Sequence, residues 1–223
     1  FYSTVGTLFS LCLTIPSAYA LSKRRLPGRR FFNIYFLIPM YFSGGLIPTY
    51  LTMKQLGVVN QWYTLIFIGA SSVYNMIVSR VYFETTIPEE LYESARIDGA
   101  NEFRTFFTIA LPLAGSILAV MSLFFAVARW NNYFNALVYV TKNDYMPLQM
   151  ILRSILLEAS NSLKGVDTSS YDPETLAQFA RRAYMAEAMK YALIIVASAP
   201  LLIAYPFVQK YFVKGMMIGA VKG

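Results

Sequence analysis

The residues best suited to polar chemistry gather in one short stretch, residues 88–101, which reads PEELYESARIDGAN. It holds four acids and one base within fourteen residues: Glu89, Glu90, Glu93, Asp98 and Arg96. Paired carboxylates can serve acid–base catalysis or polar docking, and catalysis needs suitable partners nearby. The chain has no histidine, and no serine or cysteine arrangement is typical of a nucleophile. We therefore expect no catalytic residues, and these residues alone fit either a solvated amphipathic loop or a segment that docks in another protein.

Other chemistry is also excluded by the motifs that are missing. No G-x-x-x-x-G-K-[ST] pattern occurs, so the chain has no phosphate-cradling loop of its own. A zinc site is not expected without histidine and with Cys12 alone, and an internal disulfide is excluded. We expect neither a metal nor a cofactor, and the net charge of +7 does not require nucleic acid.

A second polar group interrupts an apolar stretch at residues 128–135, which read ARWNNYFN. Aromatic faces stack on sugar rings, amides bind hydroxyls, and buried polar groups in membranes tend to face cavities. The candidate substrate-pathway residues are Tyr74, Asn75, Arg129, Trp130, Asn131, Tyr133 and Asn135. Two alternatives stay open: Trp and Tyr are common at the outer interface, and Asn can hold helices together. Arg129 could favour an anionic sugar such as a uronate, or reach out to the lipid headgroups.

The elements that position these groups are apolar enough for a bilayer. Hydrophobic residues make up 57% of the 223 residues and charged residues only 14%, whereas soluble domains carry roughly a quarter. We predict an all-α membrane protein with a single transmembrane domain, residues 1–223. Five spans are expected: Phe1–Leu21, Phe31–Tyr50, Trp62–Phe83, Leu113–Val140 and Tyr191–Phe212. The chain opens directly into an apolar segment, so we interpret it as a fragment that lacks an N-terminal part.

Two spans are interrupted by helix-breaking residues. Pro39, Gly44, Gly45 and Pro48 fall in the second, whose outer end should be kinked or unwound, and Pro200 and Pro206 in the last. Orientation follows from the connection SKRRLPGRR, which holds five bases and indicates the cytoplasmic side. Counting spans onward places residues 88–101 and the C-terminal tail on that same side.

Local signals in residues 88–101 indicate a short helix and a turn. Pro88 with the acids after it is typical of a helix start, because open amides and the helix dipole favour negative charge there. Gly99 should break the helix or turn it sharply. A second helical piece, residues 100–111, then leads to Pro112. We predict two short helices under the membrane that can enter a cleft in another protein.

The spacing within this region resembles the EAA loop of binding-protein-dependent ABC importer permeases. That pattern is E-A-A, three residues, G, nine residues, I-x-L-P. Here it is matched by Glu93-Ser94-Ala95, Gly99, Ile109 and Leu111-Pro112. The single departure is Ser94 for the first alanine.

The resemblance covers nearly the whole chain. The segments AYALSKRRLPGRRFFNIYFLIPMYFSGGLIPTYLTMKQLGVVN and QKYFVKGMMIGAVKG are similar to the maltose-type carbohydrate permeases, closest to those for oligosaccharides and polysaccharides. Members of this group have six spans, which implies one more span before Phe1, and Gly223 as the C-terminus.

The resemblance also implies a mechanism and partners. In the family the EAA loop, here residues 84–112, docks in a groove of a separate ATPase that binds the ATP and Mg. The coupling residues would be Glu93, Ser94, Ala95, Asp98, Gly99 and Ala100. Glu93 and Asp98 would make polar contacts, Ala95 and Ala100 would allow close approach, and Gly99 would give the turn. Two ATPase subunits, a second related permease and an extracytoplasmic solute-binding protein would complete the importer. By the same resemblance the tail, residues 210–223, would reach the ATPase dimer.

An external loop, residues 141–190, is predicted to hold an amphipathic segment at Met146–Ala159 and a flexible tract at Ser160–Tyr171. A further helix should follow, with Asp172 as its N-cap. In the maltose-type group the equivalent loop reaches the sugar site of the binding protein.

Alternatives of other classes remain open at the sequence level. They are the same importer class with a non-sugar or sugar-phosphate solute, an ion-coupled secondary carrier, and a membrane scaffold. A secondary carrier would need carboxylates inside the spans, whereas the acids here lie in the connections.

Overall fold

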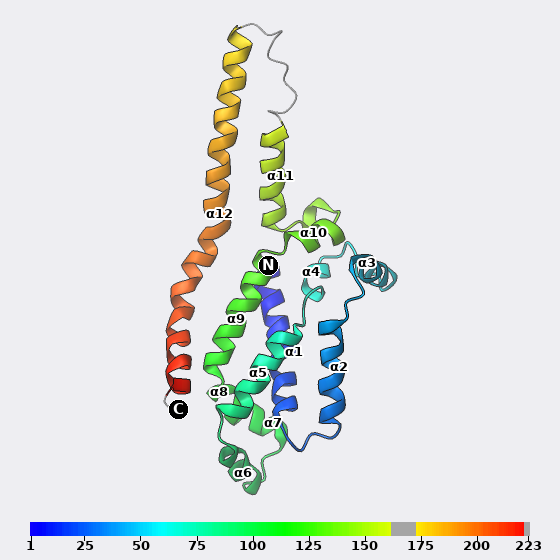
Figure 1. Ribbon diagram of the computed structural model, residues 1–223, viewed down its shortest axis with the longest axis vertical. Helices are drawn as coiled ribbons and strands as arrows, with labels where there is room; N and C mark the ends of the chain where they lie inside the picture. The colour runs from blue at the N-terminus through cyan, green and yellow to red at the C-terminus, as the bar shows by residue number, and fades with distance from the viewer. Residues whose placement is uncertain (162–172, 221–223) are drawn as a thin grey trace.

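The computed structural model describes residues 1–161 and 173–220, and every regular element in these ranges is helical (Figure 1). The first half consists of α1 (Tyr2–Ser22), α2 (Arg29–Tyr41), α3 (Leu46–Gln55), α4 (Thr64–Phe67), α5 (Val73–Thr85), α6 (Glu89–Ile97) and α7 (Glu102–Thr105). The second half consists of the π-helical turn η1 (Phe106–Ala110), α8 (Leu111–Leu113), α9 (Gly115–Trp130), α10 (Tyr133–Tyr139), the 3₁₀ turn η2 (Asn143–Tyr145), α11 (Leu148–Asn161) and α12 (Pro173–Ala220).

Helix α1 lies at the centre of the bundle and packs against α5 and α9. Ser10, Thr14 and Ala18 are buried and recur every fourth residue, so they share one face of α1. Small side chains at this spacing let helices approach closely, which drives packing where lipid removes the hydrophobic contrast. Larger buried side chains such as Phe83, Met121 and Phe125 fill the space between α5, α9 and α1.

Two helices in the described ranges are long and apolar enough to cross a membrane, Tyr2–Ser22 and the part Glu187–Pro206 of α12. Two bent pairs raise the number to four if each pair is one span. One pair is α2 with α3, bent by 118°, and the other is Glu102–Leu113 with α9, bent by 80°. The predicted kink in the second span is thereby confirmed, and Gly45, with φ +83°, stands at the bend.

The third predicted span, Trp62–Phe83, is not one helix. It is divided into α4 and α5, and neither piece is long enough to span a membrane alone. Gly69 takes a φ of +74°, which ends α4, and the Ser72 side chain accepts from the Asn75 amide to begin α5. The expectation of a continuous helix was wrong here because a turn and a cap fall inside the apolar run.

The fourth predicted span, Leu113–Val140, also differs. Helix α9 ends at Trp130, and a new short helix α10 begins at Tyr133. Asn131 closes α9 through its amide, which donates to the Val127 carbonyl at 3.0 Å. By contrast the last span is a continuous helix through Pro200 and Pro206, and prolines are tolerated inside spanning helices whose neighbours satisfy the freed carbonyls.

The two ends of the bundle carry different elements (Figure 1). The basic connection between α1 and α2 lies at the same end as α6 and α7, and the last turns of α12 also run to this end. Helices α3, α4, α10 and α11 lie toward the opposite end. This arrangement agrees with the sidedness expected from the lysine and arginine distribution.

Beyond that opposite end, α11 and the first half of α12 pack against each other. The predicted amphipathic segment Met146–Ala159 corresponds to α11, and the helix expected after Asp172 begins at Pro173. The predicted flexible tract falls mostly on residues 162–171, which lie outside the described residues, as do the N-cap Asp172 and the end of the tail, residues 221–223.

Candidate functional site

The α6–α7 segment, residues 89–105, is the predicted pair of short helices. Helix α6 begins directly after Pro88, and Glu89 and Glu90 occupy its first turn. Tyr92 and Ala95 are 3% and 5% exposed and stand three residues apart, so they form the inward face of α6. This face packs on the bundle, and the opposite face is left to solvent.

Gly99 ends α6 in the conformation that its position requires. Its φ is +75°, a region that costs side chains other than glycine roughly 1–2 kcal/mol. The Gly99 amide donates to the Arg96 carbonyl at 3.1 Å, and the Ala100 amide donates to the Ala95 carbonyl at 2.9 Å. These two bonds form a Schellman motif, which satisfies the last carbonyls of the helix. The predicted turn is therefore present.

Helix α7 begins two residues later than the predicted second piece. The Asn101 side chain accepts from the Arg104 amide at 2.8 Å and so caps the helix. An ion pair spans the turn, because Arg96 Nη2 lies 3.8 Å from Glu102 Oε1. The two helices are thus linked by the motif, by a cap and by a charge pair. Asn101 followed by Glu102 is a recognisable helix start that the sequence reasoning missed.

The solvent face of the α6–α7 segment is mixed in character. Glu93, Ser94, Asp98 and Gly99 are exposed, in agreement with a docking role for these positions. Two large apolar side chains lie among them, Ile97 at 86% and Phe103 at 79% exposure. Exposed apolar groups surrounded by acids are a feature of protein-binding surfaces. Phe103 was not singled out from the sequence.

Ala95 and Ala100 are not exposed in the way that direct contact with a partner would require. Ala95 is buried against the chain itself, and Ala100 is half-buried. Their backbones meet in the Schellman motif, so small residues here serve the turn. The close approach that the sequence predicted is made within the chain.

A charged pocket separates α6 from the basic connection after α1. Its volume is about 510 Å³, and both signs of charge line it, including Arg24, Arg29, Glu89, Glu93 and Arg96. Lys23 and Tyr92 meet at its inner wall, where the Lys23 ammonium lies 2.7 Å from the centre of the Tyr92 ring. Burial lowers the pKa of Lys23 to about 8, against the opposing attraction of Glu89 and Glu102. Burial also raises the pKa of Tyr92 to about 12, so its phenol stays neutral.

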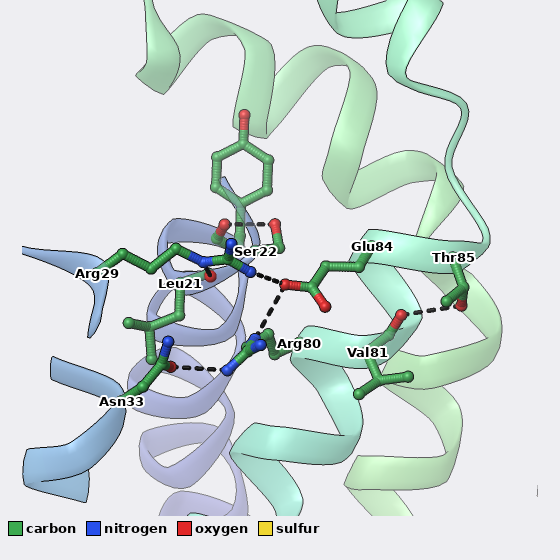
Figure 2. Close-up of polar contacts among 9 residues, drawn as sticks. Leu21, Ser22, Arg29, Asn33, Arg80, Val81, Glu84 and Thr85 are labelled. Carbon is green, nitrogen blue, oxygen red and sulfur yellow. Dashed lines mark hydrogen bonds and ion pairs between the residues drawn. The ribbon is translucent and has the colours of Figure 1, made fainter. Parts of the chain in front are cut away.

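A second network holds α1, α2 and α5 together beside this pocket (Figure 2). Arg29 donates from Nε to the Leu21 carbonyl at 2.8 Å and pairs through its terminal nitrogen with Glu84. Arg80 reaches the same Glu84 oxygen at 3.0 Å and donates to the Asn33 amide oxygen at 2.7 Å. One carboxylate thus bridges two guanidinium groups, which fixes the basic connection onto α5.

The candidate pathway residues fall into two separate groups. On α5, Tyr74 is 59% exposed whereas its neighbour Asn75 is 8% exposed. In the region of α9 and α10, Asn131 and Tyr133 are exposed, and Asn135 is half-buried. Arg153 of α11 stacks over the Tyr133 ring at 5.3 Å. Tyr74, Asn131 and Tyr133 thus retain the exposure that a solute contact needs.

Arg129 and Trp130 are engaged inside the protein. Arg129 is 7% exposed, and its guanidinium donates to three carbonyls at the end of α4 and to one hydroxyl of α1: Leu65, Ile66, Ile68 and Ser10. Both terminal nitrogens of the guanidinium are thus bonded inside the protein and not directed at the headgroups. The Trp130 indole donates to the Ala197 carbonyl at 2.8 Å and joins α9 to α12. For both side chains the geometry supports a role in packing between helices. From the sequence, this role was considered only for the asparagines.

Metal chemistry finds no support in the described ranges, where no cluster of three His, Cys, Asp or Glu side chains occurs. What the geometry offers is a helical membrane bundle with a rigid, exposed segment at the end that bears the basic connection. A bundle of this kind is suited to a protein that spans a membrane, because helices satisfy their backbone hydrogen bonds internally.

The chain belongs to the family described as binding-protein-dependent transport system inner membrane component, whose model matches residues 5–218. It is a permease of an ABC importer for saccharides, a multi-pass inner-membrane protein and a non-catalytic component of its system. A system of this kind includes a binding protein and an ATPase.

Similar curated proteins and a solved structure support this assignment. The chain is 40% identical to Protein LplC of Bacillus subtilis, with all of this chain and 72% of that protein covered. It is 38% identical to the polygalacturonan/rhamnogalacturonan transport system permease protein YtcP of the same organism, covering all of this chain and 74% of YtcP. A bacterial ABC transporter involved in the import of the acidic polysaccharide alginate matches with a TM-score of 0.80 and 34% identity, over 95% of this chain and 72% of the other.

Proposed function

We propose that this permease passes an oligosaccharide, handed over by a solute-binding protein, across the cytoplasmic membrane and is driven through the α6–α7 segment. The observation that carries the proposal is the solvent face of that segment, where Ile97 and Phe103 stand exposed among acids. The segment is braced on both sides of Gly99, and a rigid element transmits a movement that a loose loop would absorb.

The residues proposed for coupling divide by role. Glu93 and Asp98 contact the ATPase, with Ser94 beside them, since all three are exposed. Gly99 sets the turn. Ala95 and Ala100 act indirectly, because their backbones close the motif that holds the turn.

Charge reversal at Glu93 tests this proposal. In vesicles that hold the complete complex, Glu93→Lys should abolish stimulation of ATP hydrolysis by the loaded binding protein while the permease remains inserted. Glu90→Lys is the matched control, because Glu90 is an exposed acid on the same helix outside the proposed contact. Normal stimulated hydrolysis in Glu93→Lys would refute the assignment of the coupling surface.

Five spans are proposed, with α4 and α5 together forming the third. Residues 84–112 form the coupling loop and 141–190 the external loop of one transmembrane domain, residues 1–223. The external loop is proposed to meet the binding protein, since α11 and the first half of α12 extend beyond the opposite end of the bundle.

A heterodimer with a second, related permease is proposed, together with two ATPase subunits. One chain offers one α6–α7 segment, whereas a symmetric ATPase dimer has two clefts. Native mass spectrometry of the intact complex decides the matter. A transport-competent assembly with two copies of this chain and no other permease would refute the heterodimer and leave the importer assignment intact.

The substrate is proposed to be an oligosaccharide, and two of the similar proteins are named for polysaccharides: polygalacturonan/rhamnogalacturonan and the acidic polysaccharide alginate. Tyr74, Asn131, Tyr133 and Asn135 are the proposed contacts that remain accessible, whereas Asn75 is buried. Binding of the cognate solute-binding protein to a panel of neutral and uronic oligosaccharides identifies the sugar. A non-sugar or sugar-phosphate ligand from that assay would replace this substrate class.

A further inference from the structure

The end of α1 touches the α6–α7 segment on both sides of its turn. On the near side, the Tyr19 and Tyr92 ring centres lie 6.0 Å apart. On the far side, the Tyr19 hydroxyl donates to Glu102 Oε2 at 3.3 Å, and the Tyr19 ring lies 5.0 Å from that of Phe106. A single side chain of α1 therefore holds the helix before Gly99 and the helix after it.

Lys23 completes this contact one turn further along. Its ammonium lies 2.7 Å from the centre of the Tyr92 ring and 4.6 Å from that of Tyr19. Aromatic faces attract cations at this range, which offsets part of the cost of burying the charge. The ammonium finds no hydrogen-bond acceptor among the described residues, so the rings are its main partners.

The contact is built into the core of the protein. Tyr19 is 5% and Tyr92 3% exposed, and both belong to the main apolar cluster. Helix α1 in turn packs along α5 and α9. A displacement of the α6–α7 segment is therefore passed to α1, and through α1 to the two helices that form the rest of the core.

We propose that Tyr19, Lys23, Tyr92 and Glu102 form a joint, named here the α1 joint, that makes the end of α1 move with the α6–α7 segment. The proposal rests on the coupling role proposed above and adds the route by which the movement enters the bundle. These four are positioning residues: they hold two helices together and touch neither the solute nor the ATPase.

Spin labels test the joint without a known sugar. With Cys12 replaced by serine, cysteines at the exposed positions Arg24 and Glu90 carry the labels. The distance between the labels is measured in the complex with its ATPase subunits, without nucleotide and after trapping with ATP and vanadate. In the parent protein we expect one narrow distribution that is the same in both states.

Two hydroxyl deletions form a matched pair. Tyr19→Phe removes the hydroxyl bonded to Glu102, and Tyr92→Phe removes a buried hydroxyl that has no hydrogen-bond partner in the described ranges. We expect Tyr19→Phe to broaden the distribution after trapping and Tyr92→Phe to leave it narrow. Tyr92→Leu, which removes the ring, should broaden it most. Narrow distributions in both Tyr19→Phe and Tyr92→Leu would overturn the proposal.

The pH dependence of the label distance provides a measurement that a merely structural role of Lys23 would not change. The charges that act most on the Lys23 ammonium are Glu89 and Arg96 of α6 and Glu102 of α7. The same pocket is also lined by Arg24, Arg25 and Arg29 of the basic connection, Glu84 of α5 and Glu93 of α6, and the phenol rings of Tyr19 and Tyr92 face the ammonium. The pKa of Lys23 is about 8 when it is buried, against an ordinary 10.5, so closing the joint releases a proton. The distribution should therefore tighten as pH rises above 8, and Lys23→Met should abolish this dependence. A pH response that persists in Lys23→Met would count against the assignment.

Failure of the joint can be told from failure of the coupling role. A second label pair joins position 90 to the ATPase subunit. If this pair shows no short, defined distance in either state, the α6–α7 segment does not dock on the ATPase and is not the coupling surface. If the distance is short and defined while the joint variants keep a narrow distribution between positions 24 and 90, only the α1 joint is refuted.

Discussion

Replacing Arg129 by methionine separates a structural role of this arginine from a role in solute binding. The change removes every donor that reaches the Leu65, Ile66 and Ile68 carbonyls and the Ser10 hydroxyl. Each buried acceptor left without a partner costs about 1–3 kcal/mol, so the three carbonyls together predict a loss of at least about 3 kcal/mol. Arg129→Lys should lose less, because an ammonium keeps up to three donors.

Thermal unfolding of the purified permease in detergent, followed by size-exclusion chromatography, measures this loss. Arg24→Met is the matched control, since Arg24 is exposed and its change should leave the midpoint unaltered. Gly6→Ala adds an independent test, because a β-carbon at residue 6 would lie 3.2 Å from the Arg129 Cδ and Nε atoms. A smaller loss is expected there, since the contact requires the arginine side chain to shift by only a few tenths of an ångström.

The outcome that refutes this reasoning is specific. If Arg129→Met unfolds at the same temperature as the parent protein and instead weakens import of an anionic sugar alone, the guanidinium acts on the solute. Arg129 would then be assigned to the substrate pathway again, and other contacts would have to stabilise the end of α4.

Three further predictions follow from local geometry. Gly99→Ala should destabilise the α6–α7 segment by about 1–2 kcal/mol, and Gly99→Asn should destabilise it by less. The reason is that only the φ of +75° opposes a side chain at this position, since no atom lies within 4 Å of the new β-carbon. Hydrogen exchange of the α6 amides measures the difference. With Cys12 replaced by serine, a cysteine at Glu90 should label only from the cytoplasm and one at Lys142 only from outside, and the reverse pattern would overturn the sidedness. Trp130→Phe should cost about 1 kcal/mol in thermal unfolding, because it removes one indole hydrogen bond to α12 and keeps an aromatic ring; an unchanged midpoint would show that the bond is not stabilising.

The sequence by itself determined what depends on residues near one another in the chain. Long apolar runs indicate membrane helices whatever their neighbours, because length and composition alone set the cost of crossing lipid. The turn at Gly99 and the bend at Gly45 were predictable as well, since a backbone with positive φ selects glycine locally. The segment that resembles the EAA loop was recognised from fixed spacings within twenty residues, and its predicted helix, turn and second helix are all present.

Only the tertiary structure decided where the polar side chains of the helices point. Arg129 stood in an apolar helix and suggested a solute or headgroup contact, but its acceptors lie 61 to 64 residues away at the end of α4. Tyr19, Lys23 and Tyr92 gave no local signal, because their contact forms only when the end of α1 meets α6. A polar group buried in a membrane protein must find a partner, and packing determines which one is within reach. For this reason the sequence located the segment proposed to drive the permease, and the packing of α1 against it was needed to infer how its movement enters the bundle.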